Sequence, residues 1–160
     1  MFKKLFGQKS TSDKVVSPMS GQVVGLEEVP DPTFSEKMMG DGVAIKPDSG
    51  EVVSPVDGEI LQLFPTKHAI GIQSVSGIEY LIHIGLETVA LEGEGFEAHV
   101  KQGDKVSAGD LLITVDLDIV AQKANSTITP IVITNEVSSL DKKLGQTASK
   151  GETEIMYVEK

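Results

Sequence analysis

HAIGIQSVSGIEYLIHIG, residues 68–85 of this 160-residue chain, has the pattern of a β-hairpin. Both halves are rich in Ile and other strand-forming residues, and residues 74–77 between them have the composition of a turn. Folding at that turn would bring His68 and His83 to the same end of a two-stranded ribbon. Histidine serves as nucleophile, acid, base or metal ligand near neutral pH, so such a pair is a candidate for chemistry.

The alternation of side chains predicts which face of the sheet His83 occupies. Successive side chains of a strand point to opposite faces, so the second half has one apolar face that belongs to the core, formed by Ile78, Tyr80, Ile82 and Ile84. His83 then points outward beside Leu81, and Gly85, which has no side chain, leaves the His83 ring accessible to other molecules. We therefore expect His83 to be accessible on the outer face.

The register of the hairpin is left open by the sequence. A four-residue turn at 74–77 would place the two histidines directly opposite each other. A three-residue loop with Gly77 in a bulge would instead pair Ile70 with Ile82. In that second register the two rings converge only if the chain is irregular at 65–67, which reads Pro-Thr-Lys.

Composition limits the class of protein. The chain is long enough for one domain with a sizeable core, and it has neither an apolar run that would span a membrane nor the apolar segment of a secretion signal after Met1. The absence of cysteine is typical of a cytoplasmic protein and excludes a thiol nucleophile. A net charge of −10 argues against nucleic acid and favours partners with a basic surface. All 14 basic residues are lysine, so no arginine clamp holds a phosphate.

From residue 15 to 160, short β-branched runs alternate with Gly, Pro, Asp and Ser. This pattern predicts a single all-β domain, an antiparallel β-sandwich or barrel, with short helical turns at 118–123 and 137–144. Residues 1–14 differ in composition. We expect a flexible segment there, or alternatively an amphipathic turn that touches anionic lipid through Phe2, Leu5 and Phe6.

The chain also contains a short internal repeat. The sequence VVSP occurs at 15–18 and again at 52–55, and a glycine follows three residues later in both cases, at Gly21 and Gly58. Two interpretations are open: a pseudo-symmetric pair of β units, or the recurrent composition of tight β turns.

Three hypotheses compete for the histidine pair. The rings are hydrogen-bonded without a special role, or they bind a metal with only two obvious protein ligands, or they form a phosphohistidine carrier. In a carrier, one imidazole attacks a phosphoryl group and the other donates a hydrogen bond to it. The lack of arginine favours the carrier, because a clamp would retain a group that has to be passed on. His99 has no evident partner and is expected to be an ordinary surface residue.

Several motifs in order resemble one known family, the glucose-type IIA component (EIIA type-1 domain) of the bacterial phosphoenolpyruvate-dependent sugar phosphotransferase system. They are VPDPTFSEKMMGDGVAIKP (29–47), SPVDGEILQLFPTKHAIGI (54–72), LIHIGLETVALEGEGF (81–96), GDKVSAGDLL (103–112) and STITPIVITN (126–135). The resemblance extends over about residues 15–158, with its motif core at 33–137. It implies a compact antiparallel β-sandwich.

The resemblance also implies roles for individual residues. His83, in LIHIG, would be phosphorylated on Nε2, and His68, in TKHAI, would donate a hydrogen bond to the phosphoryl oxygens. Thr66 would orient the ring of His68, and the backbone carbonyl of Gly85 would accept the Nδ1 proton of His83. HPr would be the phosphodonor, and a cysteine of a IIB domain the acceptor. No cofactor would be required, although some relatives share a zinc ion with a partner through the two histidines.

An apolar surface surrounds the family site, and its matching positions here are Phe34, Met38, Met39, Leu81 and Val89. Packing into the core is an alternative for the two methionines. Asp31 and Glu87 match acidic positions that face a basic residue of the phosphodonor, with Glu87 in place of the expected aspartate. The implied location is the cytoplasm, with weak contact at the inner membrane face through residues 1–14 as an option.

Two other functions are considered. SPVDGEI and KQGDKVSAGDLL also resemble the arms of biotinyl or lipoyl carrier domains, for which Lys37 is the nearest modifiable lysine, in the wrong context. A purely regulatory binding protein on the same scaffold is the third option.

Overall fold

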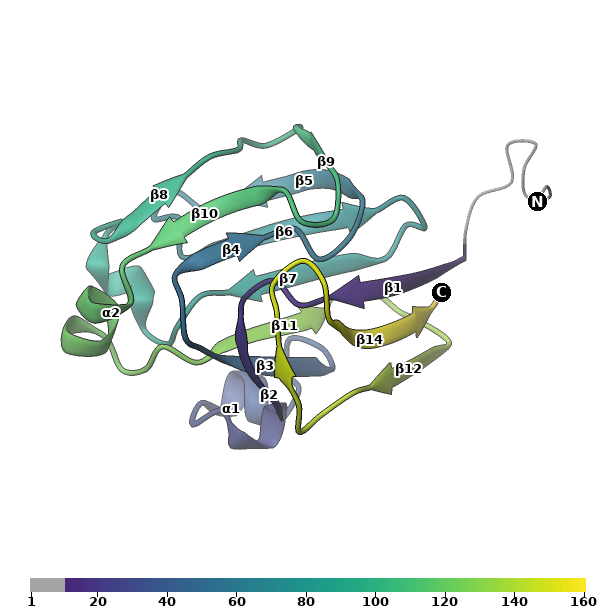
Figure 1. The fold of residues 1–160 in the computed structure, drawn as a ribbon, viewed down its shortest axis with the longest axis horizontal. Helices are drawn as coiled ribbons and strands as arrows, with labels where there is room; N and C mark the ends of the chain where they lie inside the picture. The colour runs from purple at the N-terminus through teal and green to yellow at the C-terminus, as the bar shows by residue number, and fades with distance from the viewer. Residues whose placement is uncertain (1–10) are drawn as a thin grey trace.

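The structure, a computed structural model, describes residues 11–160, and nearly all of its regular elements are β-strands (Figure 1). The strands are β1 (Ser12–Val16), β2 (Gly21–Gly25), β3 (Gly42–Pro47), β4 (Glu51–Val53), β5 (Gly58–Leu63), β6 (Ala69–Ser74), β7 (Glu79–His83), β8 (Phe96–Ala98), β9 (Lys105–Val106), β10 (Leu111–Val115), β11 (Thr129–Ile133), β12 (Ser139–Lys142), β13 (Thr147–Ala148) and β14 (Glu154–Glu159). The helical elements are α1 (Pro32–Ser35), α2 (Leu117–Lys123) and the 3₁₀ turns η1 (Leu26–Glu28) and η2 (Thr88–Leu91).

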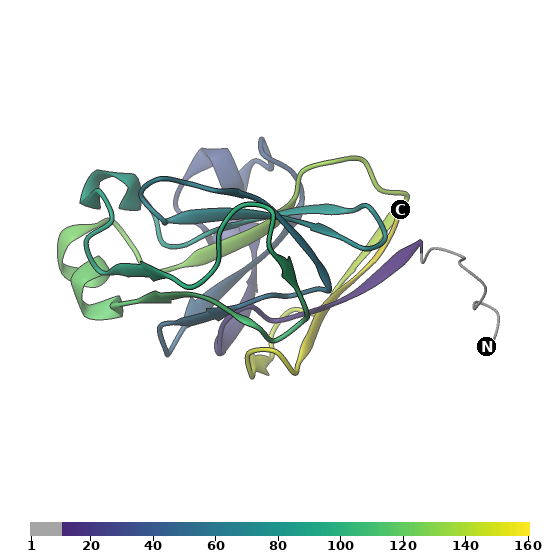
Figure 2. The same cartoon turned by 90° about the horizontal axis from the view of Figure 1, so that it is seen from above.

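These strands form an antiparallel sandwich, as predicted. One sheet has eight strands in the order β13-β2-β3-β11-β7-β6-β5-β9, and two small sheets have the orders β1-β14-β12 and β4-β10-β8. The small sheets cover one face of the large sheet (Figures 1 and 2). A single apolar core joins all three, with Met156 from one small sheet, Leu112 from the other and Ile82 from the large sheet all fully buried.

The internal repeat, VVSP at 15–18 and 52–55, corresponds to a pseudo-twofold relation between two β units. The large sheet has the same arrangement when counted from either edge. Strands β2 and β3 are second and third from one edge, and β5 and β6 are second and third from the other. The two VVSP segments also bond to each other reciprocally. The Val16 N–H donates to the Pro55 carbonyl over 3.0 Å. The Val53 N–H donates to the Pro18 carbonyl over 2.8 Å.

The β6–β7 hairpin adopts the second of the two registers. Ile70 pairs with Ile82, and Ala69 rather than His68 lies opposite His83. The expected irregularity lies at Lys67, whose φ of +62° turns the chain just before β6. This turn lets the ring of His68 approach His83 although the two residues are not paired.

Two expectations about local structure meet different outcomes. The helical turn expected at 118–123 is confirmed as α2, which begins where the Asp116 carboxylate accepts the backbone N–H of Asp118. The turn expected at 137–144 is wrong, because this segment contains β12, an edge strand paired with β14. Pairing with a strand distant in sequence overrides the local pattern here.

The N-terminal boundary also differs from the expectation. Strand β1 starts at Ser12 and pairs with β14, so the sandwich includes residues 12–14, which were assigned to the N-terminal segment. The flexibility or amphipathic contact expected of that segment concerns mainly residues 1–10, which lie outside the described part of the chain.

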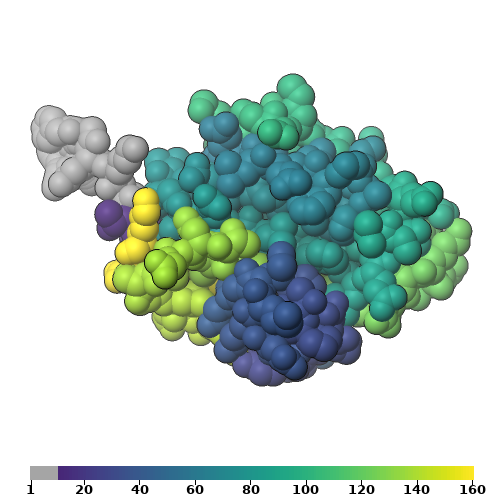
Figure 3. All heavy atoms as spheres, turned by 180° about the vertical axis from the view of Figure 1, so that it is seen from behind, coloured from purple at the N-terminus to yellow at the C-terminus, as the bar shows by residue number. Residues whose placement is uncertain are grey.

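A second, smaller apolar cluster lies on the outer face of the large sheet. Residues 26–41, which include η1 and α1, cover β3 and β11 there and bury Leu26, Phe34 and Val132. Figure 3 shows this segment, in dark purple and blue, packed over the back of the molecule. The outer face beyond it, at the ends of β6 and β7, is where the two histidines lie.

One buried hydrogen bond between the layers generates a stability prediction. The Tyr80 hydroxyl of β7 donates to the Asp13 carboxylate of β1 over 2.7 Å, and burial together with this bond raises the pKa of Tyr80. Tyr80→Phe leaves the buried carboxylate without that donor, so we expect the free energy of unfolding in urea to fall by roughly 1–3 kcal/mol.

Tyr157→Phe is the matched control, since the Tyr157 hydroxyl bonds Ser12 at an exposed position. The control should change the unfolding free energy by less than about 0.5 kcal/mol. Equal losses in both variants would contradict a special role for the buried bond.

Candidate functional site

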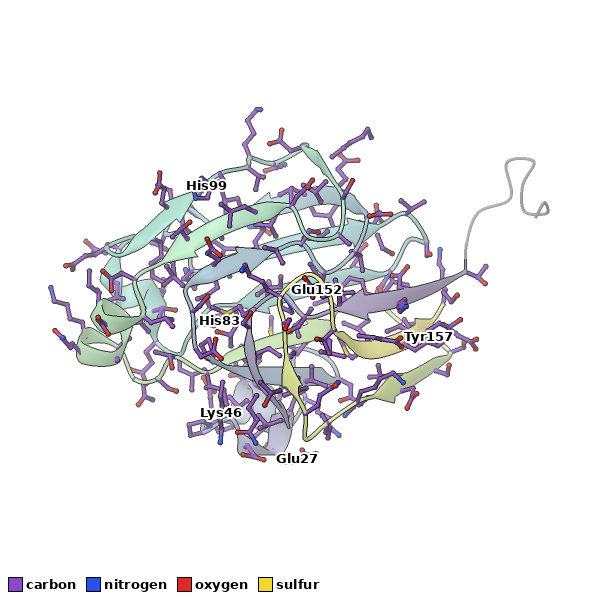
Figure 4. All side chains as sticks on the ribbon, viewed as in Figure 1. Glu27, Lys46, His83, His99, Glu152 and Tyr157 are labelled. Carbon is purple, nitrogen blue, oxygen red and sulfur yellow. The ribbon has the colours of Figure 1, made fainter. Side chains whose placement is uncertain are left out.

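The tautomer of His83 is fixed by its backbone partner. The ring lies at the end of β7 (Figure 4), and its Nδ1 is 2.8 Å from the carbonyl oxygen of Gly85. A carbonyl oxygen can only accept a hydrogen bond, so Nδ1 carries the proton. In neutral His83, Nε2 then holds a free lone pair and can act as a nucleophile or ligand.

His68 faces His83 from the start of β6. Their ring centroids are 5.1 Å apart and the planes are nearly perpendicular, at 77°. The Thr66 hydroxyl is hydrogen-bonded to Nδ1 of His68. When this hydroxyl donates, the proton of neutral His68 lies on Nε2. Nε2 of His68 can then donate a hydrogen bond, while Nε2 of His83 can accept one.

Two phenylalanines support the rings. Phe34 of α1 packs against His83 at a centroid distance of 5.1 Å, and Phe64 contacts His68 edge-on at 5.5 Å. Such tilted contacts restrict how each imidazole can rotate. Phe64 was not singled out from the sequence, although its place in FPTKH, four residues before His68, is a signal that a turn brings it back to the ring.

Both imidazoles are held neutral by their surroundings. Burial, and to a lesser extent the neighbouring His83, lower the pKa of His68 to about 4. Burial also lowers the pKa of His83, although the Gly85 carbonyl and the charge of Asp31 partly offset this effect. The arrangement at neutral pH is therefore an uncharged nucleophile beside an uncharged hydrogen-bond donor.

The five apolar residues expected around the site divide into two groups. Met38, Met39 and Val89 are exposed, at 70%, 43% and 55% of their surface. Phe34 and Leu81 are 4% and 8% exposed, so the expectation that they are surface residues is wrong: the cover formed by 26–41 buries them in the outer cluster. For the two methionines, the alternative of core packing is thereby ruled out.

A shallow groove lies next to Phe64, the residue whose ring contacts His68. It has a volume of about 230 Å³, and Met39, Phe64 and Leu81 are among its lining residues. Asp31, at the start of α1, accepts the Thr33 N–H over 3.0 Å, while Glu87 is exposed at the start of η2. Both acidic residues therefore flank the site on helical segments.

The third histidine, His99, is a surface residue. His99 is exposed and bonds the Thr114 hydroxyl over 2.8 Å, and Figure 4 shows it in a different part of the molecule from His83. Within residues 11–160, no group of three or more His, Cys, Asp or Glu side chains is arranged to hold a metal ion.

Gly85 is a position where any side chain should perturb the site. Its φ is +71°, and an added Cβ would lie 2.8 Å from the Ser126 carbonyl oxygen and 2.8 Å from the Thr88 methyl. We expect Gly85→Ala to destabilise the protein and to displace the carbonyl that holds His83, visible as a changed ¹⁵N chemical shift of the His83 ring.

Gly109→Ala is the control that separates the backbone strain of a positive φ from the steric clash of an added Cβ. Gly109 also has a positive φ, +96°, but nothing lies within 4 Å of an added Cβ. It should therefore show only the backbone strain, about 1–2 kcal/mol, and an unchanged His83 ring. If Gly85→Ala cost no more than Gly109→Ala, the packing around Gly85 would not be the constraint described here.

The lowered pKa of His68 predicts a pH dependence of stability. Between its ordinary value of 6.5 and about 4, the unfolded chain binds a proton that the folded protein does not. The free energy of unfolding should therefore fall as the pH drops through this window. His68→Gln should show a shallower fall in urea titrations at pH 7, 6, 5 and 4.5, and an identical slope in the two proteins would contradict the lowered pKa.

Comparison with known proteins agrees with this geometry. Residues 13–138 match the family described as the phosphoenolpyruvate-dependent sugar phosphotransferase system, EIIA 1. The chain is 60% identical over 162 residues to a PTS system glucose-specific EIIA component of Bacillus anthracis, covering 99% of this chain and 98% of that protein. It is 46% identical to the solved structure of glucose permease IIA from Mycoplasma capricolum, with a TM-score of 0.87 over 92% of this chain and 96% of that one.

A further relative has a different domain arrangement. The PTS system glucose-specific EIICBA component of Staphylococcus carnosus is 60% identical over 121 residues, which cover 76% of this chain but 18% of that longer protein. No helix among residues 11–160 has the length and apolar character needed to cross a bilayer. The family match over most of the chain, the identity to the Bacillus protein and the shared fold show that this chain belongs to the EIIA type 1 family of the phosphoenolpyruvate-dependent sugar phosphotransferase system.

Proposed function

We propose that this protein is a phosphocarrier that accepts a phosphoryl group from phospho-HPr on Nε2 of His83 and passes it to a cysteine of a IIB domain. The observation that carries the proposal is the hydrogen bond from His83 Nδ1 to the Gly85 carbonyl, which leaves Nε2 as the nucleophilic atom. The family membership of the chain supports the same assignment.

The transfer step needs only one bond to form and one to break. The lone pair of His83 Nε2 attacks phosphorus, and the bond between phosphorus and the donor histidine of HPr breaks, returning its electron pair to that nitrogen. The His83 Nδ1 proton stays in its bond to Gly85, where the carbonyl stabilises the positive charge that develops on the ring. In the second transfer the IIB thiolate attacks phosphorus and Nε2 leaves.

His68 stabilises the phosphoryl group in this scheme. Its Nε2–H donates to a phosphoryl oxygen, and Thr66 holds the ring in the tautomer that makes this possible. The donor is neutral at pH 7 because burial lowers its pKa. A neutral donor binds the phosphoryl group less tightly than a cationic clamp, which suits a group that has to leave again.

The two partners would dock on the surface around the histidines. Exposed Met38, Met39 and Val89 offer an adaptable apolar contact, because methionine side chains repack easily against different partners. Asp31 and Glu87 supply negative charge at the rim, and the chain has a net charge of −10, so partners with basic surfaces are attracted. Phe34 would contribute by holding the His83 ring in place, and Leu81 would contribute as part of the lining of the groove.

The wider setting follows from the relatives. Several are named as glucose-specific components, and the fusion of EIIA with EIIC and EIIB in the Staphylococcus carnosus protein supports a IIB domain as acceptor. We infer cytoplasmic phosphoryl transfer for this chain, without a required cofactor. A zinc ion held by His68 and His83 would need its further ligands from a partner, since zinc sites have three or four protein ligands.

The alternative of a biotinyl or lipoyl carrier has less support. Lys37, its nearest modifiable residue, lies within 3.9 Å of Glu27 and 3.8 Å of Asp41, in ion pairs rather than alone at a hairpin tip. A purely regulatory protein would keep the docking surface but would have no use for the fixed tautomer of His83.

Reconstitution tests the proposal. Incubation with phosphoenolpyruvate, Enzyme I and HPr should add one acid-labile phosphoryl group, measured by intact mass, to the wild type and to His99→Gln, and none to His83→Ala. His68→Gln should accept the group but transfer it to IIB at least tenfold more slowly, because it lacks the imidazole donor. An unphosphorylated wild type, with HPr itself phosphorylated, would overturn the proposal and leave the regulatory alternative.

A further inference from the structure

The Gly85 carbonyl belongs to a pair of consecutive peptide groups in which every polar atom is hydrogen-bonded. In the first, between Ile84 and Gly85, the Thr88 hydroxyl donates to the carbonyl over 2.7 Å. The N–H of that same peptide donates to the Thr129 hydroxyl over 3.4 Å. These two threonines therefore hold one peptide group from both sides.

The second peptide group lies between Gly85 and Leu86. Its carbonyl accepts the Nδ1 proton of His83, and its N–H donates to the Ser126 carbonyl over 2.9 Å. The backbone at Gly85 could otherwise rotate freely, because glycine is the residue with the widest choice of conformation. The orientation of the carbonyl that faces His83 therefore depends on its neighbours.

The threonine hydroxyls are placed as support rather than as solvent contacts. Thr88 and Thr129 are both fully buried, and each hydroxyl has a defined direction. Thr88 gives its proton to Ile84, while Thr129 gives its proton to the Thr127 carbonyl and so turns a lone pair toward the Gly85 N–H. The 2.7 Å bond is the stronger of the two contacts to the clamped peptide, since 3.4 Å is beyond the usual range.

We propose that Thr88 and Thr129 are positioning residues that set the tautomer of His83 by clamping the Ile84–Gly85 peptide group. Loss of either hydroxyl leaves this peptide held from one side only, so that it can turn. The Gly85 carbonyl of the next peptide, whose N–H bonds Ser126, then tilts away from Nδ1. Neutral His83 can then place its proton on Nε2 instead, and this tautomer has no lone pair there for attack on phosphorus. The tautomer claim stands independently, whereas its effect on phosphoryl transfer rests on the proposed function.

The test compares Thr88→Val with Thr88→Ser, and Thr129→Val with Thr129→Ser, in the full-length protein. Valine keeps the shape and removes the hydroxyl, and serine restores the hydroxyl. Thr114→Val is the control, because the Thr114 hydroxyl bonds a histidine, His99, outside the site. Two readouts are taken at pH 7.5: the ¹⁵N shifts of the His83 ring, which report the tautomer, and the rate of phosphorylation by phospho-HPr as kcat and KM.

Thr88→Val should show a mixed His83 tautomer and a kcat about tenfold lower, with little change in KM, in the range typical of residues that orient a reactive group. Thr129→Val should show a smaller change of the same kind, and both serine variants and Thr114→Val should behave as the wild type. A merely structural role would lower the melting temperature without changing the tautomer.

The outcomes separate the inference from the proposed function. If the folded Thr88→Val protein keeps the wild-type ring shifts and kcat, the inference is overturned while phosphorylation of the wild type still stands. If the wild type is not phosphorylated, the proposed function fails, and the ring shifts alone decide whether the threonines set the tautomer.

Discussion

The hydrogen bond from His83 Nδ1 to the Gly85 carbonyl is the contact on which the chemistry of the site depends. It selects the ring nitrogen that stays unprotonated, and it does so with a backbone group that cannot change its charge. The geometry requires a positive φ at residue 85 and leaves no room for a Cβ, so glycine is the residue that fits. A side chain in the role of acceptor would be free to rotate, whereas this carbonyl is fixed by the strand end and loop that carry it.

The pseudo-twofold relation explains why the site lies where it does. In one half, β2 is followed by the long segment 26–41, which folds back over the outer face of the sheet and buries it. In the other half, β5 is followed by the short turn at 64–68, and Leu61 on the outer face of β5 stays 38% exposed. The histidines lie at the edge between these two regions. Phe34 from the cover packs on His83, and Phe64 from the turn packs on His68.

Local patterns in the sequence were sufficient for some features and insufficient for others. Period-two alternation correctly placed Ile82 in the core and His83 outside, because a strand fixes the side of each residue by itself. The hairpin register stayed open, since it depends on the conformation of Lys67 and Gly77, which neighbouring residues do not determine. The burial of Phe34 and Leu81 and the pairing of β12 depend on segments distant in the chain, and no local pattern contains that information.

The lack of arginine and the lowered pKa values have one physical consequence. A phosphoryl group carries up to two negative charges, and a cationic clamp on it would make each departure slow. The site instead offers two imidazoles that burial keeps unprotonated. Under the proposed function, the positive charge of the His83 ring would develop only when phosphorus is attached. The electrostatic attraction between the His83 ring and the phosphoryl group would thus rise as the bond from Nε2 to phosphorus forms and disappear when that bond breaks. Under the proposed function, such a site would exchange the phosphoryl group in either direction at similar free energy, and the basic surfaces of the partners would supply the countercharge during docking.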